Sequence, residues 1–172
     1  MRSLNTEERR RCIGEELNKS EGPLKGTELA KLFGVSRQVI VQDIAILRAE
    51  GLPVIATPNG YIIIKPSENN LLKKVAVKHS REGLADELGI MLDYGARIID
   101  VVVEHPVYGE IVGNLNINCK EDLVDFMDRI SKQDIEPLSA LTEGIHIHTV
   151  EVPNEETFEK MMDELRKYNF LV

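Results

Sequence analysis

Residues 28–51 allow few choices of local structure, because apolar residues at helical spacing occur on both sides of a glycine. The short run 28–33 is followed by Gly34, which can take the positive φ that ends a helix. Ser36 can then cap a second helix that stops at Gly51. We therefore predict two helices joined by a glycine turn, which is a helix-turn-helix. The apolar face of the second helix comprises Ile40, Ile44 and Leu47.

The segments on either side of this helix pair complete a winged-helix pattern. Asn5 and Glu8 have the spacing of a capping box, and apolar residues repeat at helical spacing after them. Beyond the helix pair, the β-rich runs 54–56 and 61–64 flank an Asn-Gly dipeptide, which is a strong signal for a hairpin. Three helices followed by a hairpin predict a winged helix-turn-helix domain over residues 1–65.

Residues 65–70 are polar and contain a proline, and we expect them to link the first domain to a second one at residues 71–172. The second part alternates β-rich and helical patterns in the order β-α-β-β-α-β-α, which predicts one sheet covered by helices. The expected fold class is therefore α+β, a winged helix-turn-helix followed by an α+β sandwich regulatory domain. The expected strands are 75–79, 96–105, 111–117 and 145–152, and the expected helices are 81–93, 121–131 and 154–168.

Charge is divided unevenly between the two parts of the chain. The net charge of −8 combines +2 over residues 1–65, from 10 Lys and Arg against 8 Asp and Glu, with −10 over the remainder, from 11 against 21. A phosphate backbone attracts cations and repels a carboxylate-rich surface. If this protein binds DNA, we therefore expect the first part to make the contact.

Two further observations limit the class of protein. No apolar stretch approaches the roughly 20 residues that span a bilayer, and the N-terminal residues lack the apolar segment of a secretory signal. Only Cys12 and Cys119 are present, without CxxC spacing, so we expect neither a disulfide framework nor a thiolate metal site. These features predict a cytoplasmic protein with no membrane partner.

The polar face of the second helix carries side chains that can read bases. Ser36, Arg37 and Gln38 lie at its start, and Gln42 lies one turn later. In the major groove of double-stranded DNA, arginine can form two hydrogen bonds to guanine and glutamine can form two to adenine. The alternative is a packed helix pair whose polar face is only solvated. The stretch SRQVIVQDIAILRAEG resembles the winged helix-turn-helix of biotin-repressor-like regulators, and this resemblance favours DNA binding.

All four histidines lie in the second part of the chain. His146 and His148 alternate along a predicted strand, so they share a face about 6.6 Å apart. Glu87 falls beside the apolar stripe of a predicted helix, where a carboxylate is costly unless it is paired or binds a cation, and His79 ends the preceding strand. Such a set suits Zn²⁺, Ni²⁺ or Fe²⁺ and disfavours Mg²⁺ or Ca²⁺. Taken singly, each histidine is more commonly a surface or hydrogen-bonded core residue.

The stretches HPVYGEIVGNLNI and LSALTEGIHIHTVEV resemble the regulatory 3H domain of niacin-responsive transcriptional repressors, and with the winged helix the resemblance covers essentially the whole chain. It implies a repressor of genes for NAD synthesis and niacin uptake, with nicotinic acid or a close relative as corepressor. His105 matches another histidine of that family, and it either shapes the effector pocket with Tyr108 or caps the strand end. The resemblance also implies a divalent metal ion held by His79, Glu87, His146 and His148.

Two rival functions fit part of the same pattern. Histidines and a carboxylate with open positions also occur in metal-dependent enzymes, but no nucleophile and base pair or phosphate loop accompanies them here. In a pure metalloregulator, by contrast, the metal itself is the signal. For either regulator we expect a homodimer on an inverted repeat, because one recognition helix reads few base pairs.

Overall fold

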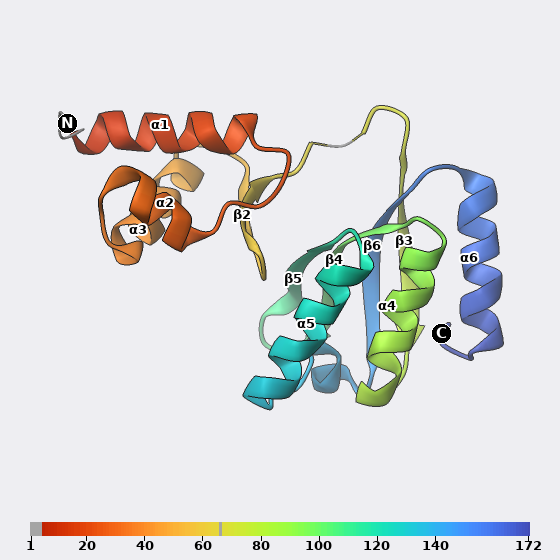
Figure 1. The fold of residues 1–172 in the computed structure, drawn as a ribbon. Helices are drawn as coiled ribbons and strands as arrows, with labels where there is room; N and C mark the ends of the chain where they lie inside the picture. The colour runs from red at the N-terminus through yellow and green to blue at the C-terminus, as the bar shows by residue number, and fades with distance from the viewer. Residues whose placement is uncertain (1–4, 66) are drawn as a thin grey trace. The chain divides into compact units, whose positions relative to one another are not determined.

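The computed structural model describes residues 5–65 and 67–172, which divide into two compact units on either side of residue 66 (Figure 1). Residues 1–4 of the expected DNA-binding domain and Pro66 of the expected linker lie outside the described residues. Each unit has its own cluster of buried apolar side chains, and the mixture of helix and sheet confirms the α+β class. None of the described helices is long and apolar enough to cross a lipid bilayer.

The first unit consists of three helices and a two-stranded antiparallel hairpin, in the order of a winged helix-turn-helix. The expected capping box starts the first helix: the backbone N–H of Glu8 donates to Asn5 Oδ1 at 2.9 Å, and that of Asn5 donates to Glu8 Oε2 at 3.0 Å. These bonds satisfy backbone donors that have no partner within the helix. The elements are α1 (Thr6–Lys19), α2 (Gly26–Phe33), α3 (Arg37–Ala49), β1 (Val54–Thr57) and β2 (Gly60–Ile63).

The turn between α2 and α3 follows the expected local chemistry. Gly34 has a φ of 65° and ends α2, and Ser36 Oγ accepts the backbone N–H of Val39 at 3.3 Å at the start of α3. α2 begins at Gly26, slightly before the expected start. One side of α3 packs into the core of the unit, which leaves its polar side exposed. The buried apolar side chains of α3 are Ile40, Ile44 and Leu47.

A buried ion pair fixes α3 against α1. Arg9 Nε donates to Asp43 Oδ2 at 2.7 Å and Arg9 Nη2 donates to Oδ1 at 3.3 Å, while Asp43 is almost fully buried. The hydrogen bond to Asp43 raises the pKa of the Arg9 guanidinium above its ordinary value. A two-point contact resists rotation of the helix about its own axis. The pair therefore helps to set which side of α3 faces outward.

The hairpin is attached to the helical part through Leu24. Leu24 and Tyr61 exchange two backbone hydrogen bonds, each of 2.9 Å. Gly60 makes this close approach possible, because its φ is +133° and a Cβ there would lie 2.5 Å from the Leu24 carbonyl oxygen. The wing is therefore tied to the domain by its backbone.

The second unit is a four-stranded antiparallel sheet in the strand order β3-β6-β4-β5, with α4, α5 and α6 on one face (Figure 1). The order of its main elements is the expected β-α-β-β-α-β-α, although the first strand starts at Leu71, earlier than expected, and a 3-10 turn precedes α4. The elements are β3 (Leu71–Lys78), η1 (Arg81–Gly83), α4 (Leu84–Asp93), β4 (Arg97–His105), β5 (Gly109–Ile117), α5 (Lys120–Gln133), η2 (Leu138–Thr142), β6 (Ile145–Val152) and α6 (Glu155–Lys167).

The core of this unit lies between the three helices and one face of the sheet. Burying one large apolar side chain stabilises a fold by about 1.5–3 kcal/mol, and here all three helices and all four strands contribute such side chains. Alternate residues of a strand share a face, so the face that packs the core also presents His146 and His148 to the helices. Core members include Val75, Ile98, Leu115 and Val150 from the strands and Leu88, Met91, Ile130, Met161 and Leu165 from the helices.

Candidate metal centre and nucleic-acid surface

Glu87 is a fully buried carboxylate on α4. Its exposed fraction is 0%, and its helical neighbours Leu84, Leu88 and Met91 all belong to the apolar core. A buried charge costs several kcal/mol unless it is paired and hydrogen-bonded. The sequence placed Glu87 beside the apolar stripe, and the structure places it inside the core, so partners for this carboxylate are obligatory.

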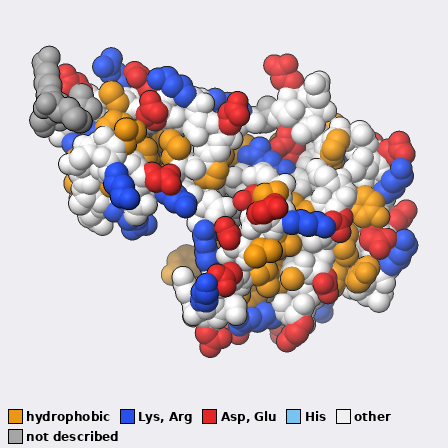
Figure 2. Space-filling model, in the orientation of Figure 1, with side chains coloured by type: hydrophobic (Ala, Val, Ile, Leu, Met, Phe, Trp, Pro, Cys, Tyr) orange, Lys and Arg blue, Asp and Glu red, His pale blue; other side chains and the backbone are white. Residues whose placement is uncertain are grey.

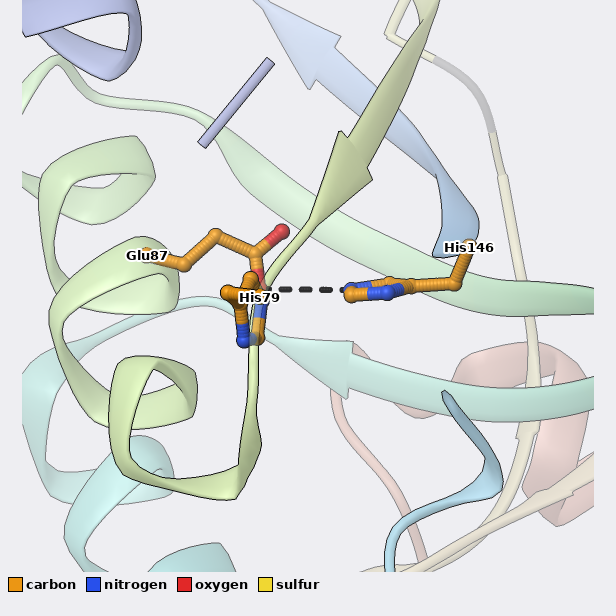
Figure 3. Close-up of side chains that lie close together, drawn as sticks. All are labelled: His79, Glu87 and His146. Atoms are coloured by element: carbon orange, nitrogen blue, oxygen red, sulfur yellow. Dashed lines mark hydrogen bonds and ion pairs between the residues drawn. The ribbon is translucent and has the colours of Figure 1, made fainter. Parts of the chain in front are cut away.

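Three imidazole rings supply these partners: His79 follows β3, and His146 and His148 both lie on β6. His79 Nε2 lies 2.6 Å from Glu87 Oε2, and His146 Nε2 lies 3.4 Å from the same oxygen. His148 Nε2 lies 3.1 Å from the other oxygen, Oε1. In Figure 3 the rings of His79, which follows β3, and His146, on β6, converge on the Glu87 carboxylate of α4. The structure therefore brings together all four residues of the expected metal set.

The second nitrogen of each ring is already engaged by the backbone. In all three rings Nδ1 lies within hydrogen-bonding distance of a carbonyl oxygen, which can only accept, so Nδ1 carries the proton. In a neutral ring, Nε2 then presents a lone pair toward Glu87. This arrangement is usual for metal-bound histidines, where the backbone orients the ring. The acceptors are Ser80 O at 2.7 Å for His79, Gly144 O at 2.9 Å for His146 and Asp100 O at 2.7 Å for His148.

Two backbone features place these rings. Gly144 has a φ of +90°, and a Cβ there would lie 2.3 Å from the carbonyl oxygen of His79, so only glycine lets the two segments approach. On β4, the register with β6 shifts between Ile98 and Asp100, as in a β-bulge. Asp100, next to this bulge, accepts His148 Nδ1–H through its carbonyl and the backbone N–H of Thr149 through Oδ1.

The electrostatics of the cluster favour a charged carboxylate. Burial raises the pKa of Glu87, but the charge of His148 and the hydrogen bonds from His146 and His79 outweigh it and hold this pKa well below its usual range. Burial lowers the pKa of His79, and its hydrogen bond to Glu87 reverses the sign, so the pKa is raised. At His148, too, burial lowers the pKa, but the negative charge of Glu87 outweighs burial, so the pKa is raised.

Three of these residues, His79, Glu87 and His146, have the spacing of a divalent-cation site, and His148 lies beside them. Glu87 Oε1 and His148 Nε2 are buried and, within the described residues, have no hydrogen-bond partner, although they lie 3.1 Å apart. The ligand atoms of His79, Glu87 and His146 all lie within 4.8 Å of one another. Without a cation, each ring would need a second proton to satisfy Glu87, and one divalent ion can replace those protons. Three imidazole nitrogens and one carboxylate suit Zn²⁺, Ni²⁺ or Fe²⁺.

The expected base-reading side chains share the exposed side of α3. Ser36, Arg37, Gln38 and Gln42 are all exposed, opposite the buried apolar side of the helix. Figure 2 shows Lys and Arg side chains over α2 and α3 of this unit, with few acidic ones among them. The helix-turn-helix therefore presents a polar, partly cationic surface of the kind that enters a major groove.

The structure separates His105 and Tyr108 from the four-residue cluster. Both lie at the β4–β5 hairpin, where the backbone N–H groups of Val107 and Tyr108 donate to His105 Nδ1 at 3.2 and 3.3 Å. Tyr108 is 77% exposed, and the rings of His105 and Tyr108 are 5.1 Å apart. This geometry supports the alternative in which His105 closes the end of the strand.

Several groups that build the site carried little signal in the sequence. The three backbone carbonyls cannot be recognised from residue types, and the ion pair of Arg9 with Asp43 joins residues 34 positions apart. One signal was available: Gly144 stands two residues before His146, where a glycine in a strand pattern indicates a close backbone approach.

Comparisons with known proteins agree with this architecture. The 3H domain family matches residues 72–172, and a helix-turn-helix family described as "HTH domain" matches residues 9–62. The chain is 44% identical to the "Probable transcription repressor NiaR" of Thermotoga maritima over 166 residues, which are 96% of this chain and 94% of that protein. It is 35% identical to the "Transcription repressor NadR" of Bacillus subtilis over 159 residues, which are 91% of this chain and 88% of that protein.

The cluster predicts opposite effects of pH on the chelated and the metal-loaded protein. Because the pKa values of His79 and His148 are raised, their protonation stabilises the fold fully below about pH 6.5, and this contribution is lost as pH rises through the folded pKa. Glu87, with its lowered pKa, contributes stability above about pH 4.5. We therefore expect the thermal unfolding temperature of the chelated protein to decrease as the pH is raised from 6 to 8.

Added Ni²⁺ or Zn²⁺ should restore the midpoint at pH 8 and have much less effect at pH 6, because metal ligation requires neutral imidazole. Thermal unfolding at both pH values, with and without the ion, measures this. His105→Ala is the matched control, since this histidine lies outside the cluster and its removal should leave the pattern intact. A chelated protein as stable at pH 8 as at pH 6 would contradict the expectation.

Proposed function

Because the chain belongs to the niacin-responsive repressor family, in which a helix-turn-helix domain precedes a 3H domain, we propose that it represses transcription in response to nicotinic acid. In this proposal the N-terminal domain binds double-stranded operator DNA in the cytoplasm, and the controlled genes serve NAD synthesis and niacin uptake. The protein is a regulator and not an enzyme. The observation that carries the proposal is the buried cluster of three histidines and Glu87 within the 3H domain.

The proposed cofactor is a divalent transition metal ion, Ni²⁺, Zn²⁺ or Fe²⁺. When bound, such an ion acts as a Lewis acid that can accept a carboxylate or a ring nitrogen of the effector. The chain itself orients the imidazoles through backbone carbonyls and excludes water by burying Glu87 in the core. The proposed ligands are His79, Glu87, His146 and His148.

Two cavities border the cluster, and their charges differ. One, of about 490 Å³, is lined by His79 together with the cationic side chains of Lys78 and Arg81, as well as acidic ones. The other, of about 720 Å³, is lined by His146, Glu104 and Glu110 and, among its described lining residues, by no lysine or arginine. Nicotinate is an anion at neutral pH, so the first cavity suits it better. We place the effector there, beside His79.

In this proposal the effector acts by linkage. A small molecule strengthens DNA binding only if it binds the DNA-competent arrangement more tightly than the alternative. A coupling free energy of about 1–3 kcal/mol corresponds to a change of roughly 5- to 150-fold in DNA affinity. We further propose a homodimer, since two recognition helices are needed to read an inverted-repeat operator with useful specificity.

The proposed function predicts that nicotinic acid tightens DNA binding and that a chelator abolishes this effect. A duplex selected by the wild-type protein from a random pool serves as the operator. With metal present, we expect nicotinic acid to lower the Kd by roughly 5- to 150-fold. Nicotinamide, which lacks the carboxylate, is expected to have less effect. Fluorescence anisotropy with labelled duplex measures each Kd.

Glu87→Gln tests whether the cluster mediates this response, because it removes the charge while keeping the shape. His105→Ala is again the control and should respond as the wild type does. A Kd that follows free metal and ignores nicotinic acid would instead identify a metalloregulator. No enrichment of any duplex sequence would contradict the proposal as a whole.

The placement of α3 predicts a specific role for two of its exposed side chains. Arg37→Ala and Gln42→Ala should each weaken binding to the selected duplex by about 1–3 kcal/mol if they read bases, with little change on random DNA. Both side chains are exposed, so the thermal midpoint should stay within about 2 °C of the wild type. Equal losses on selected and random DNA would show that they contact phosphates only.

A further inference from the structure

The face of the sheet opposite the three helices carries an apolar row that crosses all four strands. The strand register aligns Ala76 of β3, Ile147 of β6, Val102 of β4 and Val112 of β5. We call the side chains of this face, which alternate with those of the core, the open face. It comprises Leu72, Lys74, Ala76, Lys78, Arg97, Asp100, Val102, Glu104, Glu110, Val112, Asn114, Ile145, Ile147, Thr149 and Glu151.

Much of the open face is exposed. The exposed fractions are 55% for Leu72, 50% for Val112 and 44% for Ile145, and Ala76 is exposed as well. Ile147 is half-buried and Val102, at the centre of the row, is 8% exposed. Figure 2 views this unit from the helical side, where acidic and basic side chains intermingle over the helices. Monomeric proteins rarely expose large contiguous apolar patches without a partner. The apolar row on the open face therefore indicates an interaction surface.

The charges around the apolar row are separated by strand. Arg97 and Glu151, at one end of the open face, form an ion pair with each other at 3.5 Å. Among the other charged side chains, β3 at one edge contributes Lys74 and Lys78, whereas β4 and β5 toward the other edge contribute Glu104 and Glu110. All four side chains are exposed, and in the part of the chain that the structure describes no ion pair involves any of them. The open face is therefore positive at one edge, negative at the other and apolar between them.

We propose that the open face binds the open face of a second copy of this chain, about a twofold axis that runs parallel to the strands. This axis places β3 of one copy over β5 of the other. Ala76 then meets Val112, Ile147 meets Val102, and Lys78 meets Glu110 of the partner copy. The inference deepens the proposed function, because it rests on the homodimer proposed there and assigns its interface.

The alternative orientation is disfavoured by charge. With the twofold axis perpendicular to the strands, β3 would lie over β3, and Lys78 of one copy would approach Lys74 of the other. Like charges facing each other across an interface are destabilising and select against that register. The flat area of a four-stranded face with eight-residue strands is roughly 500 Å², which is below the about 800 Å² per partner of a standard interface, so the relief of the side chains has to supply the remainder.

Pairing of sheet edges is the other way in which such a sheet could dimerise. At the outer edge of β3 the C-terminal residues already bond to the strand, since Lys78 N–H donates to Phe170 O at 2.7 Å and Val172 N–H donates to Ala76 O at 3.3 Å. This contact leaves β5 as the edge strand for pairing. An edge-paired dimer through β5 would not involve Lys78, which lies at the opposite edge.

Sedimentation of the metal-loaded full chain, without effector or DNA, tests the interface. Val112→Lys should raise the dimer dissociation constant at least about 100-fold, because the proposed axis places residue 112 between Lys74 and Lys78 of the partner copy, which would repel a further cation. Val124→Lys is the matched control: Val124 is 66% exposed on α5, on the helical side, and its change should leave the dimer intact. The thermal unfolding midpoint of each variant is measured as well, and a midpoint equal to that of the wild type shows that the variant is folded.

Charge reversal tests the orientation. Lys78→Glu and Glu110→Lys should each raise the dissociation constant by about tenfold, and combining them should return it to within about threefold of the wild type. A wild-type dimer that neither Val112→Lys nor Lys78→Glu weakens would overturn this interface while leaving the proposed dimeric repressor in place. A wild-type protein that is monomeric at all accessible concentrations would contradict both the interface and the proposed dimer. A double variant whose dissociation constant stays as high as that of the single variants would overturn the orientation.

Discussion

The fold of the second unit depends on how a buried carboxylate is neutralised. Glu87 is 0% exposed among core side chains, and its partners are the imidazole of His79, which follows β3, and those of His146 and His148 on β6. Neither Glu87 nor the rings can be satisfied alone, because each ring already has one nitrogen bonded to a backbone carbonyl. The cluster therefore ties α4 to the sheet, and any ion that binds there acts on the packing of the whole unit.

The same strand connects the cluster to the segment that leads to the DNA-binding unit. β6 carries His146 and His148, and three residues further on it carries Glu151, which is almost fully buried. Glu151 Oε1 accepts the backbone N–H of Ser67 at 3.1 Å and the side-chain amide of Asn70 at 3.2 Å. A change in the position of β6 would thus reach the linker through hydrogen bonds that involve charge, which are stronger than neutral ones.

Sequence patterns predicted the elements better than the contacts between them. Asn5, Gly34 and Ser36 act through their near neighbours in the chain, so their capping roles could be predicted from spacing alone. The four residues of the cluster were identified by residue type and by family resemblance. The carbonyl groups that orient the rings, and the bulge beside Asp100, depend on how distant strands pair, and no local pattern encodes them. Likewise, the charge separation on the open face becomes visible only when the strand order is known.

X-ray absorption spectroscopy of the metal-loaded protein measures the first coordination shell of the ion directly. We expect a shell of nitrogen and oxygen atoms near about 2.0–2.1 Å, with the outer-shell scattering of about three imidazole rings and no sulfur. The Glu87→Gln variant should lose most of the bound ion, because the carboxylate is the only negative charge in the cluster. A sulfur shell near about 2.3 Å, or a spectrum with no imidazole scattering, would show that the ion binds elsewhere and would contradict the central claim.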